Sequence, residues 1–175
     1  MVDTDLRYPI GEFTLPGKLE SGDRSRAIKN IADLPSTLRA AVKDLSDEQM
    51  DTPYRPEGWT PRQVVHHLPD SHMNSYTRLK LALTEDVPTI RTFDEALWAM
   101  LPDSAAPIDL SLGLLDRLHE RWVFLWRSLL EREWCRRFRH PDLGEMRVDE
   151  LLALYAWHGR HHVAHITELR KRKGW

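Results

Sequence analysis

The chain has 175 residues, of which 41% are hydrophobic and 30% charged, a composition typical of one soluble globular domain spanning residues 1–175. Its formal net charge of −2 gives no electrostatic reason to expect nucleic acid or an anionic membrane as a partner. A single cysteine, Cys135, excludes an internal disulfide, and no stretch approaches the ~18 apolar residues of a membrane-spanning helix. With no signal peptide visible at the N-terminus, these features predict a cytoplasmic protein.

The first half of the chain predicts an irregular arm and two long helices. Proline and glycine punctuate residues 1–22, so we expect an N-terminal arm whose apolar part, Tyr8–Phe13, packs onto the folded body. A helix is expected from about Asp23 to Leu45, and Pro35 within it either kinks the helix or separates two helical pieces.

The second predicted helix has the clearest start signal in the sequence. Thr60 can cap it, Pro61 suits its first turn, and Gln63 completes a capping box. Its apolar pattern continues to about Glu85, and Pro69 is expected to bend it.

A long, proline-punctuated connection over residues 86–109 follows, with a short helix expected near 93–101. A third long helix is expected from about Leu110 to Glu133. The residues predicted to form its buried face are Leu114, Leu115, Leu118, Trp122, Leu125, Trp126 and Leu129. Residues 134–148 predict a short hairpin or turn, and a fourth long helix should run from Asp149 to Lys173 and stop at Gly174. Four long amphipathic helices with long connections predict an all-α four-helix bundle.

The fourth helix carries four histidines within eight residues: His158, His161, His162 and His165. His161 and His165 are four residues apart, so they share a helix face and can converge on one divalent ion. The glutamate of an HExxH motif is absent, so the chemistry of that motif is not implied. Periodicity does not exclude His158, which lies within about 60° of this pair, whereas His162 is expected to be incidental.

Two histidines make a poor metal site, so the second helix is the place to look for a third. His66, His67 and His72 point in different directions there, and only one of them can face the fourth helix. Three histidines on facing helices would leave coordination positions open, the pattern of a catalytic metal centre. The alternative is a group of structural or surface histidines, because a single histidine on a helix face usually binds no metal.

The chain also resembles a known family. The stretch Asp51–Glu85 reads DTPYRPEGWTPRQVVHHLPDSHMNSYTRLKLALTE; with RYPIGEF from Arg7, LYAWHGRHHVAHI from Leu154 and the terminal Gly174-Trp175, it resembles the YfiT-like branch of the DinB-like superfamily. The resemblance covers nearly the whole chain and implies a DinB-like four-helix bundle, a homodimer and a divalent ion held by three histidines. The ligand that follows the family tryptophan maps onto His67, and the HxxxH pair maps onto His161 and His165.

This family is described as metal-dependent hydrolases, and some relatives as S-transferases that add bacillithiol or mycothiol to electrophiles. We therefore expect an enzyme that holds one zinc or nickel ion per chain and acts on a small molecule, as a hydrolase or thiol S-transferase. The alternative is a non-catalytic metal-binding or stress-response protein, because the sequence shows no committed general base. Residues expected near the ligands, without an assigned role, are His158, Asp70, Ser71, Asn74 and Glu168. Pro69, where the family pattern favours a small helix former, puts the orientation of His67 in question.

Overall fold

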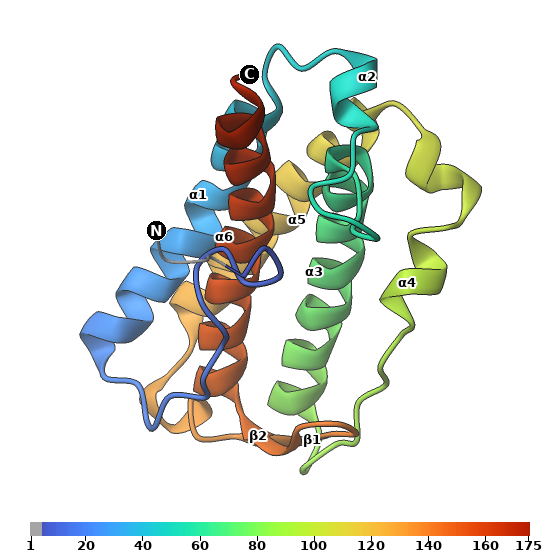
Figure 1. Cartoon of the computed structure of the whole chain (residues 1–175). Coiled ribbons are helices and arrows are strands. Elements are labelled where there is room, and N and C mark those ends of the chain that lie inside the picture. The colour runs from blue at the N-terminus through green and yellow to red at the C-terminus, as the bar shows by residue number, and fades with distance from the viewer. Residues whose placement is uncertain (1–4) are drawn as a thin grey trace.

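Four long helices pack together in the computed structural model, which describes residues 5–175 (Figure 1). They are α1 (Ser21–Val42), α3 (Pro61–Thr84), α5 (Ile108–Ser128) and α6 (Val148–Lys173). The connections contain the short helices α2 (Asp47–Met50) and α4 (Glu95–Trp98) and the 3₁₀ turns η1 (Pro102–Ala105) and η2 (Glu131–Glu133). The predicted four-helix bundle is confirmed, and none of the described helices is long and apolar enough to cross a membrane.

The local signals at the helix ends act as predicted. Thr60 Oγ1 accepts a hydrogen bond from the Gln63 amide at 3.2 Å, and Gln63 Oε1 accepts one from the Thr60 amide at 3.0 Å. Gly174 ends α6 in the left-handed conformation, with φ of 72°. Neither internal proline divides its helix, since α1 is one helix through Pro35 and α3 is one helix through Pro69.

A small hairpin closes the lower end of the bundle (Figure 1). Its antiparallel strands β1 (Arg137–His140) and β2 (Gly144–Arg147) pair Phe138 with Met146, and both of these side chains are buried. The hairpin before the last helix is therefore confirmed. The connection after α3 is tied to it, because the Ile90 amide donates to the Arg139 carbonyl at 3.0 Å.

The bundle contains two apolar cores, with polar side chains between them. Trp122 and Trp126 are fully buried in the lower core, and Leu38, Leu68 and Leu115 in the upper one. The predicted buried face of α5 was wrong at Leu114, which is 43% exposed. On α3, α5 and α6, buried histidines occupy the turns between the residues of the two cores.

A close contact between α1 and α6 sets the rotation of α6. A Cβ atom on Gly159 would come within 2.6 Å of Leu34 Cδ2, so any larger residue would force the Leu34 side chain to shift. Because Gly159 faces α1, the helical repeat turns His158 and His162 about 100° and 60° away from that contact. Both histidines then lie toward α3, as the next section describes.

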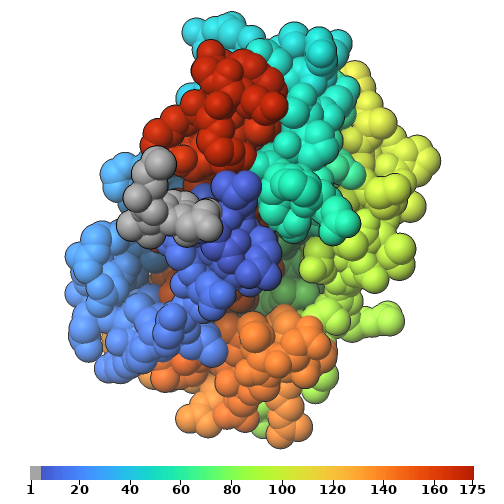
Figure 2. Space-filling view, viewed as in Figure 1, coloured from blue at the N-terminus to red at the C-terminus, as the bar shows by residue number. Residues whose placement is uncertain are grey.

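The N-terminal arm lies against α6, as predicted for its apolar part. The ring of Tyr8 is 6.2 Å from that of His161, and Phe13 is 5.6 Å from Trp157. In Figure 2 the arm (dark blue) crosses the face of the molecule beside a hollow in which α3 (green) is visible. Residues 1–4 of the predicted arm lie outside the described part of the chain.

Candidate metal centre

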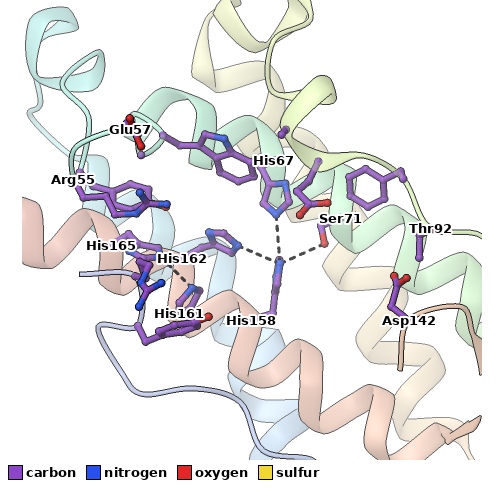
Figure 3. A pocket seen from close by; sticks show the side chains of 18 of the residues that line it. Arg55, Glu57, His67, Ser71, Thr92, Asp142, His158, His161, His162 and His165 are labelled. Carbon is purple, nitrogen blue, oxygen red and sulfur yellow. Dashed lines mark hydrogen bonds between the residues drawn. The ribbon is translucent and has the colours of Figure 1, made fainter. Parts of the chain in front are cut away.

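Two buried histidines and one partly buried histidine, from two helices, converge at the centre of the bundle (Figure 3). His158 Nε2 lies 3.4 Å from His67 Nε2 and 3.2 Å from His162 Nε2. Within residues 5–175, these three form the one group of histidine, cysteine or acidic residues whose potential ligand atoms all lie within 4.8 Å of one another. We call this group the histidine triad.

The spacing and chemistry of the triad fit a divalent cation. Nitrogens that share a tetrahedral zinc ion at 2.0–2.1 Å lie about 3.3 Å apart, close to the two separations observed here. Burial lowers the pKa of His67 to about 4. Burial, and then the neighbouring imidazoles, hold the pKa of His158 and of His162 well below the ordinary value. At neutral pH all three rings are therefore unprotonated, the form that binds a metal.

A chain of hydrogen bonds fixes the tautomer of His158. His119 Nδ1 lies 2.6 Å from the Ile31 carbonyl, which can only accept, so His119 donates from Nδ1. Its Nε2 must then accept from His72 Nδ1 at 2.8 Å, and His72 Nε2 must accept from His158 Nδ1 at 3.2 Å. His158 consequently carries its proton on Nδ1 and presents a lone pair on Nε2 to the other two histidines.

The other two rings of the triad are held mainly by aromatic neighbours. Trp59 lies 4.6 Å from His67 and stacks on His162 at 6.1 Å and 14°. Phe93 covers His67 from the long connection at 6.4 Å. His162 Nδ1 is buried with no hydrogen-bond partner among the described residues, so apart from the contact of its Nε2 with His158 the ring is positioned by packing.

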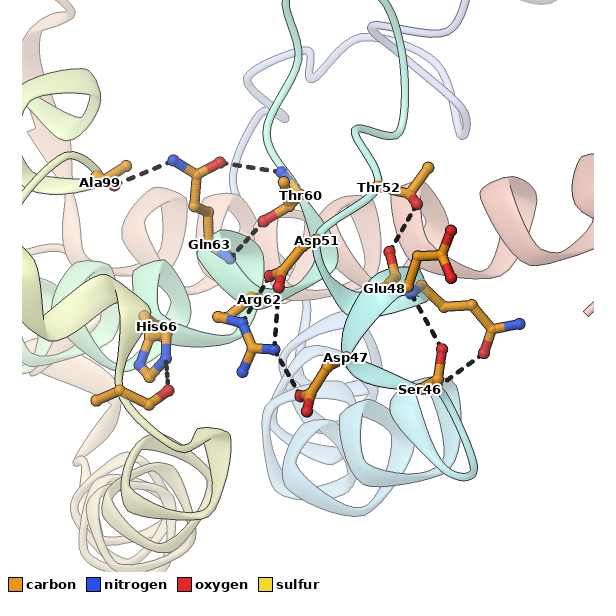
Figure 4. A network of polar contacts seen from close by, with 12 residues as sticks. Ser46, Asp47, Glu48, Asp51, Thr52, Thr60, Arg62, Gln63, His66 and Ala99 are labelled. Carbon is orange, nitrogen blue, oxygen red and sulfur yellow. Dashed lines mark hydrogen bonds and ion pairs between the residues drawn. The ribbon is translucent and has the colours of Figure 1, made fainter.

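A polar network anchors the start of α3, about one turn before His67 (Figure 4). Arg62 pairs with Asp51 at 2.7 Å and with Asp47 at 2.9 Å, and Gln63 Nε2 donates to the Ala99 carbonyl at 3.1 Å. His66, the next residue along, binds elsewhere: its ring nitrogens lie 2.7 Å from Ser111 Oγ and 2.9 Å from the Ala106 carbonyl. This arrangement leaves His67 to face α6, as the sequence analysis expected.

The structure does not bring the whole predicted ligand set together. His161 and His165 pair with each other, Nε2 to Nε2 at 3.0 Å, beside the triad rather than with His67 in it. Tyr54 stacks on His165 at 4.0 Å, and Trp157 stacks on His161 at 4.4 Å. His158, expected only near the ligands, and His162, expected to be incidental, occupy the triad instead because α6 turns that face toward α3.

The remaining candidates separate into one residue at the site and three away from it. Ser71 lines the cavity, and its Oγ lies 3.5 Å from His158 Nε2. Asp70 is half-buried outside the cavity, where burial and then the charge of Asp103 raise its pKa to about 6. Asn74 donates to the Asp70 carbonyl at 2.9 Å, and Glu168 lies 3.8 Å from Lys171 near the end of α6.

The triad forms part of the wall of an open cavity of about 670 Å³. His161 and His165, the N-terminal arm and residues of several connecting segments line the rest of the wall. The charged or polar wall residues that were not predicted from the sequence are Arg7, Tyr8, Tyr54, Arg55, Glu57, Arg78, Thr92, Glu95, His140 and Asp142. Most of these residues come from the arm, from segment 54–59, from the long connection and from the hairpin, which helical periodicity does not describe.

A comparison with known families now identifies the fold. The family model described as the DinB superfamily matches residues 31–166. The chain belongs to the DinB superfamily. YfiT from Bacillus subtilis, described as "a probable metal-dependent hydrolase with an unusual four-helix bundle topology", is 48% identical with a TM-score of 0.94, over 97% of this chain and 98% of YfiT.

Relatives in other bacilli support the same family. Proteins of Bacillus mycoides strain KBAB4 and Bacillus cereus strain AH820 are 55% and 56% identical, each over 98% of this chain and 99% of the relative. Both carry the name "putative metal-dependent hydrolase". A four-helix bundle protein, TT2238, is 19% identical with a TM-score of 0.56 over 87% of this chain and 99% of TT2238, which supports the fold alone.

Proposed function

We propose that this protein is a metal-dependent hydrolase whose cation, zinc or nickel, is held by His67, His158 and His162. The observation that carries the proposal is the convergence of three unprotonated imidazoles on the wall of an open cavity. The names of the Bacillus relatives and of YfiT support the same class of activity. This ligand set keeps His67 from the sequence analysis and replaces the pair His161 and His165 with His158 and His162.

Three neutral ligands suit hydrolysis because they leave the charge of a dication undiminished. A divalent cation held in this way would act as a Lewis acid, lowering the pKa of a bound water molecule toward ~7 or holding a bound thiol as the thiolate. The chain's own residues orient the ligands: His72 holds the ring of His158, and Trp59 packs against both other rings. Trp59 and Phe93 also exclude water from one side of His67, which strengthens electrostatic interactions at the triad.

Thiol S-transfer is the second candidate for the same site. The cavity of about 670 Å³ falls within the range of small-molecule sites and could hold a low-molecular-weight thiol such as bacillithiol together with an electrophile. The residues available to move a proton are the cavity carboxylates of Glu57, Glu95 and Asp142 and the hydroxyl of Ser71. Glutamine or asparagine variants of the three carboxylates, assayed one at a time, identify which of them acts.

The proposal is tested by assaying zinc-loaded and nickel-loaded protein against panels of esters, amides and thiol-plus-electrophile pairs. His67→Ala removes a ligand, and His66→Ala is the matched control because its buried ring bonds to Ser111 and Ala106 instead. We expect turnover in one panel that His67→Ala loses and His66→Ala keeps. If no panel shows turnover above the His67→Ala background while the metal is bound, the non-catalytic metal-binding alternative holds.

A homodimer stays a prediction from the family resemblance. Large apolar side chains exposed on α5 and the preceding segment, among them Phe124, Leu110 and Met100, support it. Light scattering after size-exclusion chromatography measures the mass directly. A mass of one chain at micromolar concentration contradicts the prediction.

A further inference from the structure

Arg78 is a buried arginine with no carboxylate partner. It is 7% exposed, and no acidic side chain within residues 5–175 forms an ion pair with it. Nη1 donates to the Tyr155 hydroxyl at 3.2 Å and Nη2 to the Arg91 carbonyl at 2.9 Å, while Nε is buried without a partner. Only two of the five N–H groups of the guanidinium are therefore used by the described chain.

An unpaired buried charge destabilises the fold, because the ion loses several kcal/mol of hydration free energy and no counter-charge compensates for the loss. Another buried arginine of the same chain shows the usual arrangement. Arg24, 6% exposed, makes a two-pronged pair with the carboxylate of Glu131 at 2.8 and 2.9 Å. Arg78 lacks such a partner, yet it lies on the wall of the cavity that the histidine triad also lines. A ligand in the cavity can supply the missing negative charge.

Arg78 and the histidine triad lie on the same cavity with one tyrosine ring between them. Tyr155 accepts from Arg78 through its hydroxyl, and its ring centroid is 5.3 Å from that of His158. Thr92 and Asp142 lie on the side of the cavity away from Arg55 and His165 (Figure 3). Because the triad and Arg78 line the same cavity, a small molecule bound there can contact both.

His140, beside Arg78 on the cavity wall, adds a second donor. Its Nδ1 accepts from the amides of Asp142 and Leu143 at 3.2 and 3.3 Å, so the neutral ring carries its proton on Nε2. Burial and then the charge of Arg78 lower the pKa of His140, which keeps the ring neutral at pH 7. The Asp142 side chain is 74% exposed and so remains hydrated, and it does not pair with Arg78.

We propose that Arg78, His140 and Thr92 form an oxyanion subsite that binds a carboxylate or phosphate group of the substrate. The buried, unpaired guanidinium supplies the charge, and the imidazole N–H and the hydroxyl are further donors. The subsite rests on the proposed function only in assigning its ligand to the substrate. It predicts that the substrate carries an anionic group several bonds away from the bond that reacts at the triad.

Isothermal titration calorimetry of metal-free protein with sodium succinate and with inorganic phosphate, at constant ionic strength, tests the subsite. Arg78→Gln should weaken binding of the preferred anion at least about tenfold, the loss expected for charge-assisted hydrogen bonds. Arg55→Gln removes the same charge from the side of the cavity away from Thr92 and should change binding less than about threefold. The tighter of the two probes tells whether the subsite prefers a carboxylate or a phosphate. Unchanged binding by Arg78→Gln, equal losses in both variants, or no binding of either anion to the wild type overturns the proposal.

Two further variants separate binding from folding. Arg78→Lys keeps the charge and should recover part of the affinity. If Arg78→Gln unfolds, Thr92→Val takes its place in the test and must weaken binding about threefold or more, or the proposal fails.

Failure of the subsite and failure of the proposed function are distinguishable. His67→Ala should keep anion binding while it loses metal and turnover. Anion binding that is lost in His67→Ala but kept in Arg78→Gln would place the anion at the triad. That result would overturn the subsite and leave the proposed metal site unaffected.

Discussion

His72 tests how the chain prepares its metal site, because it touches the ligand His158 without belonging to the triad. Replacing it with phenylalanine keeps a ring of similar size in a fully buried position. The replacement removes the acceptor for His158 Nδ1–H, a bond of 3.2 Å, and breaks the chain that runs through His119 to the Ile31 carbonyl. His158 is then free to put its proton on Nε2, the atom that faces the other two histidines.

The expected loss follows from that one bond. A buried N–H left without its acceptor costs about 1–3 kcal/mol. A histidine ligand that loses the partner of its second nitrogen binds metal about 10–100-fold more weakly, or about 1.4–2.7 kcal/mol. We therefore expect the Kd for zinc to rise about 10–100-fold in His72→Phe.

Competition with a chromophoric zinc chelator at pH 7.5 measures this Kd. His66→Phe is the matched control, since His66 is also on α3, is 5% exposed and makes two hydrogen bonds, but to Ser111 and Ala106. Both variants lose stability, so only the difference in zinc affinity between them counts. If His72→Phe binds zinc as tightly as His66→Phe, the hydrogen-bond chain does not set the tautomer of His158.

Three further predictions concern stability. Burial lowers the pKa of His119 from the ordinary 6.5 to about 4, so the unfolded chain binds more protons than the folded one between these pH values. The free energy of unfolding of the metal-free protein should therefore fall by about 3 kcal/mol for this group as the pH drops from 6.5 toward 4. Urea unfolding that is independent of pH in this window would contradict the burial of His119. Gly159→Ala should lower the free energy of unfolding, measured by thermal denaturation, by about 1–3 kcal/mol because the new Cβ meets Leu34. The control Gly113→Ala, with open space around its Cβ, should be neutral or stabilising. Equal effects would mean that the α1–α6 contact is not tight. Trp122→Ala should cost about 3–5 kcal/mol because the ring is fully buried, against less than about 1 kcal/mol for Trp98→Ala, whose ring is 37% exposed; similar losses in denaturant midpoint would contradict the core described here.

The helices could be predicted from the sequence because their signals are local. Thr60, Pro61 and Gln63 place the start of α3, and Gly174 places the end of α6, through contacts with residues at most a few positions away. The prolines left alternatives open that only the folded structure decides. Pro35 is buried within a single continuous α1, so it does not separate two helical pieces.

The sequence could not decide which histidines of α6 face α3, for a geometric reason. The fourth helix holds two pairs at four-residue spacing, His158 with His162 and His161 with His165, and the two pairs point only about 60° apart around the helix. Spacing alone does not say which pair faces α3. The close approach of Gly159 to Leu34 turns the side of α6 that carries His158 and His162 toward α3 only in the folded structure, and it joins residues far apart in the sequence. A glycine between the histidines was the one available signal, because it marks a close helix approach.

The cavity beyond the histidines was out of reach for a different reason. Arg55 and Asp142 come from loops whose course no periodic pattern describes, and Glu95 begins the four-residue helix α4, which is too short for such a pattern. Arg78 lies on a predicted helix, but its importance comes from the missing carboxylate, which only the folded structure reveals.

Metal content of single histidine variants tests the central claim most directly. Each variant is loaded with zinc, desalted and analysed for zinc per chain by inductively coupled plasma mass spectrometry, with circular dichroism to show that it is folded. His158→Ala and His162→Ala should lose most of the metal, while His161→Ala and His165→Ala should keep about one ion per chain, as the wild type does. Retention of zinc by His158→Ala and His162→Ala, with loss in the other two, would contradict the triad and restore the pair expected from the sequence.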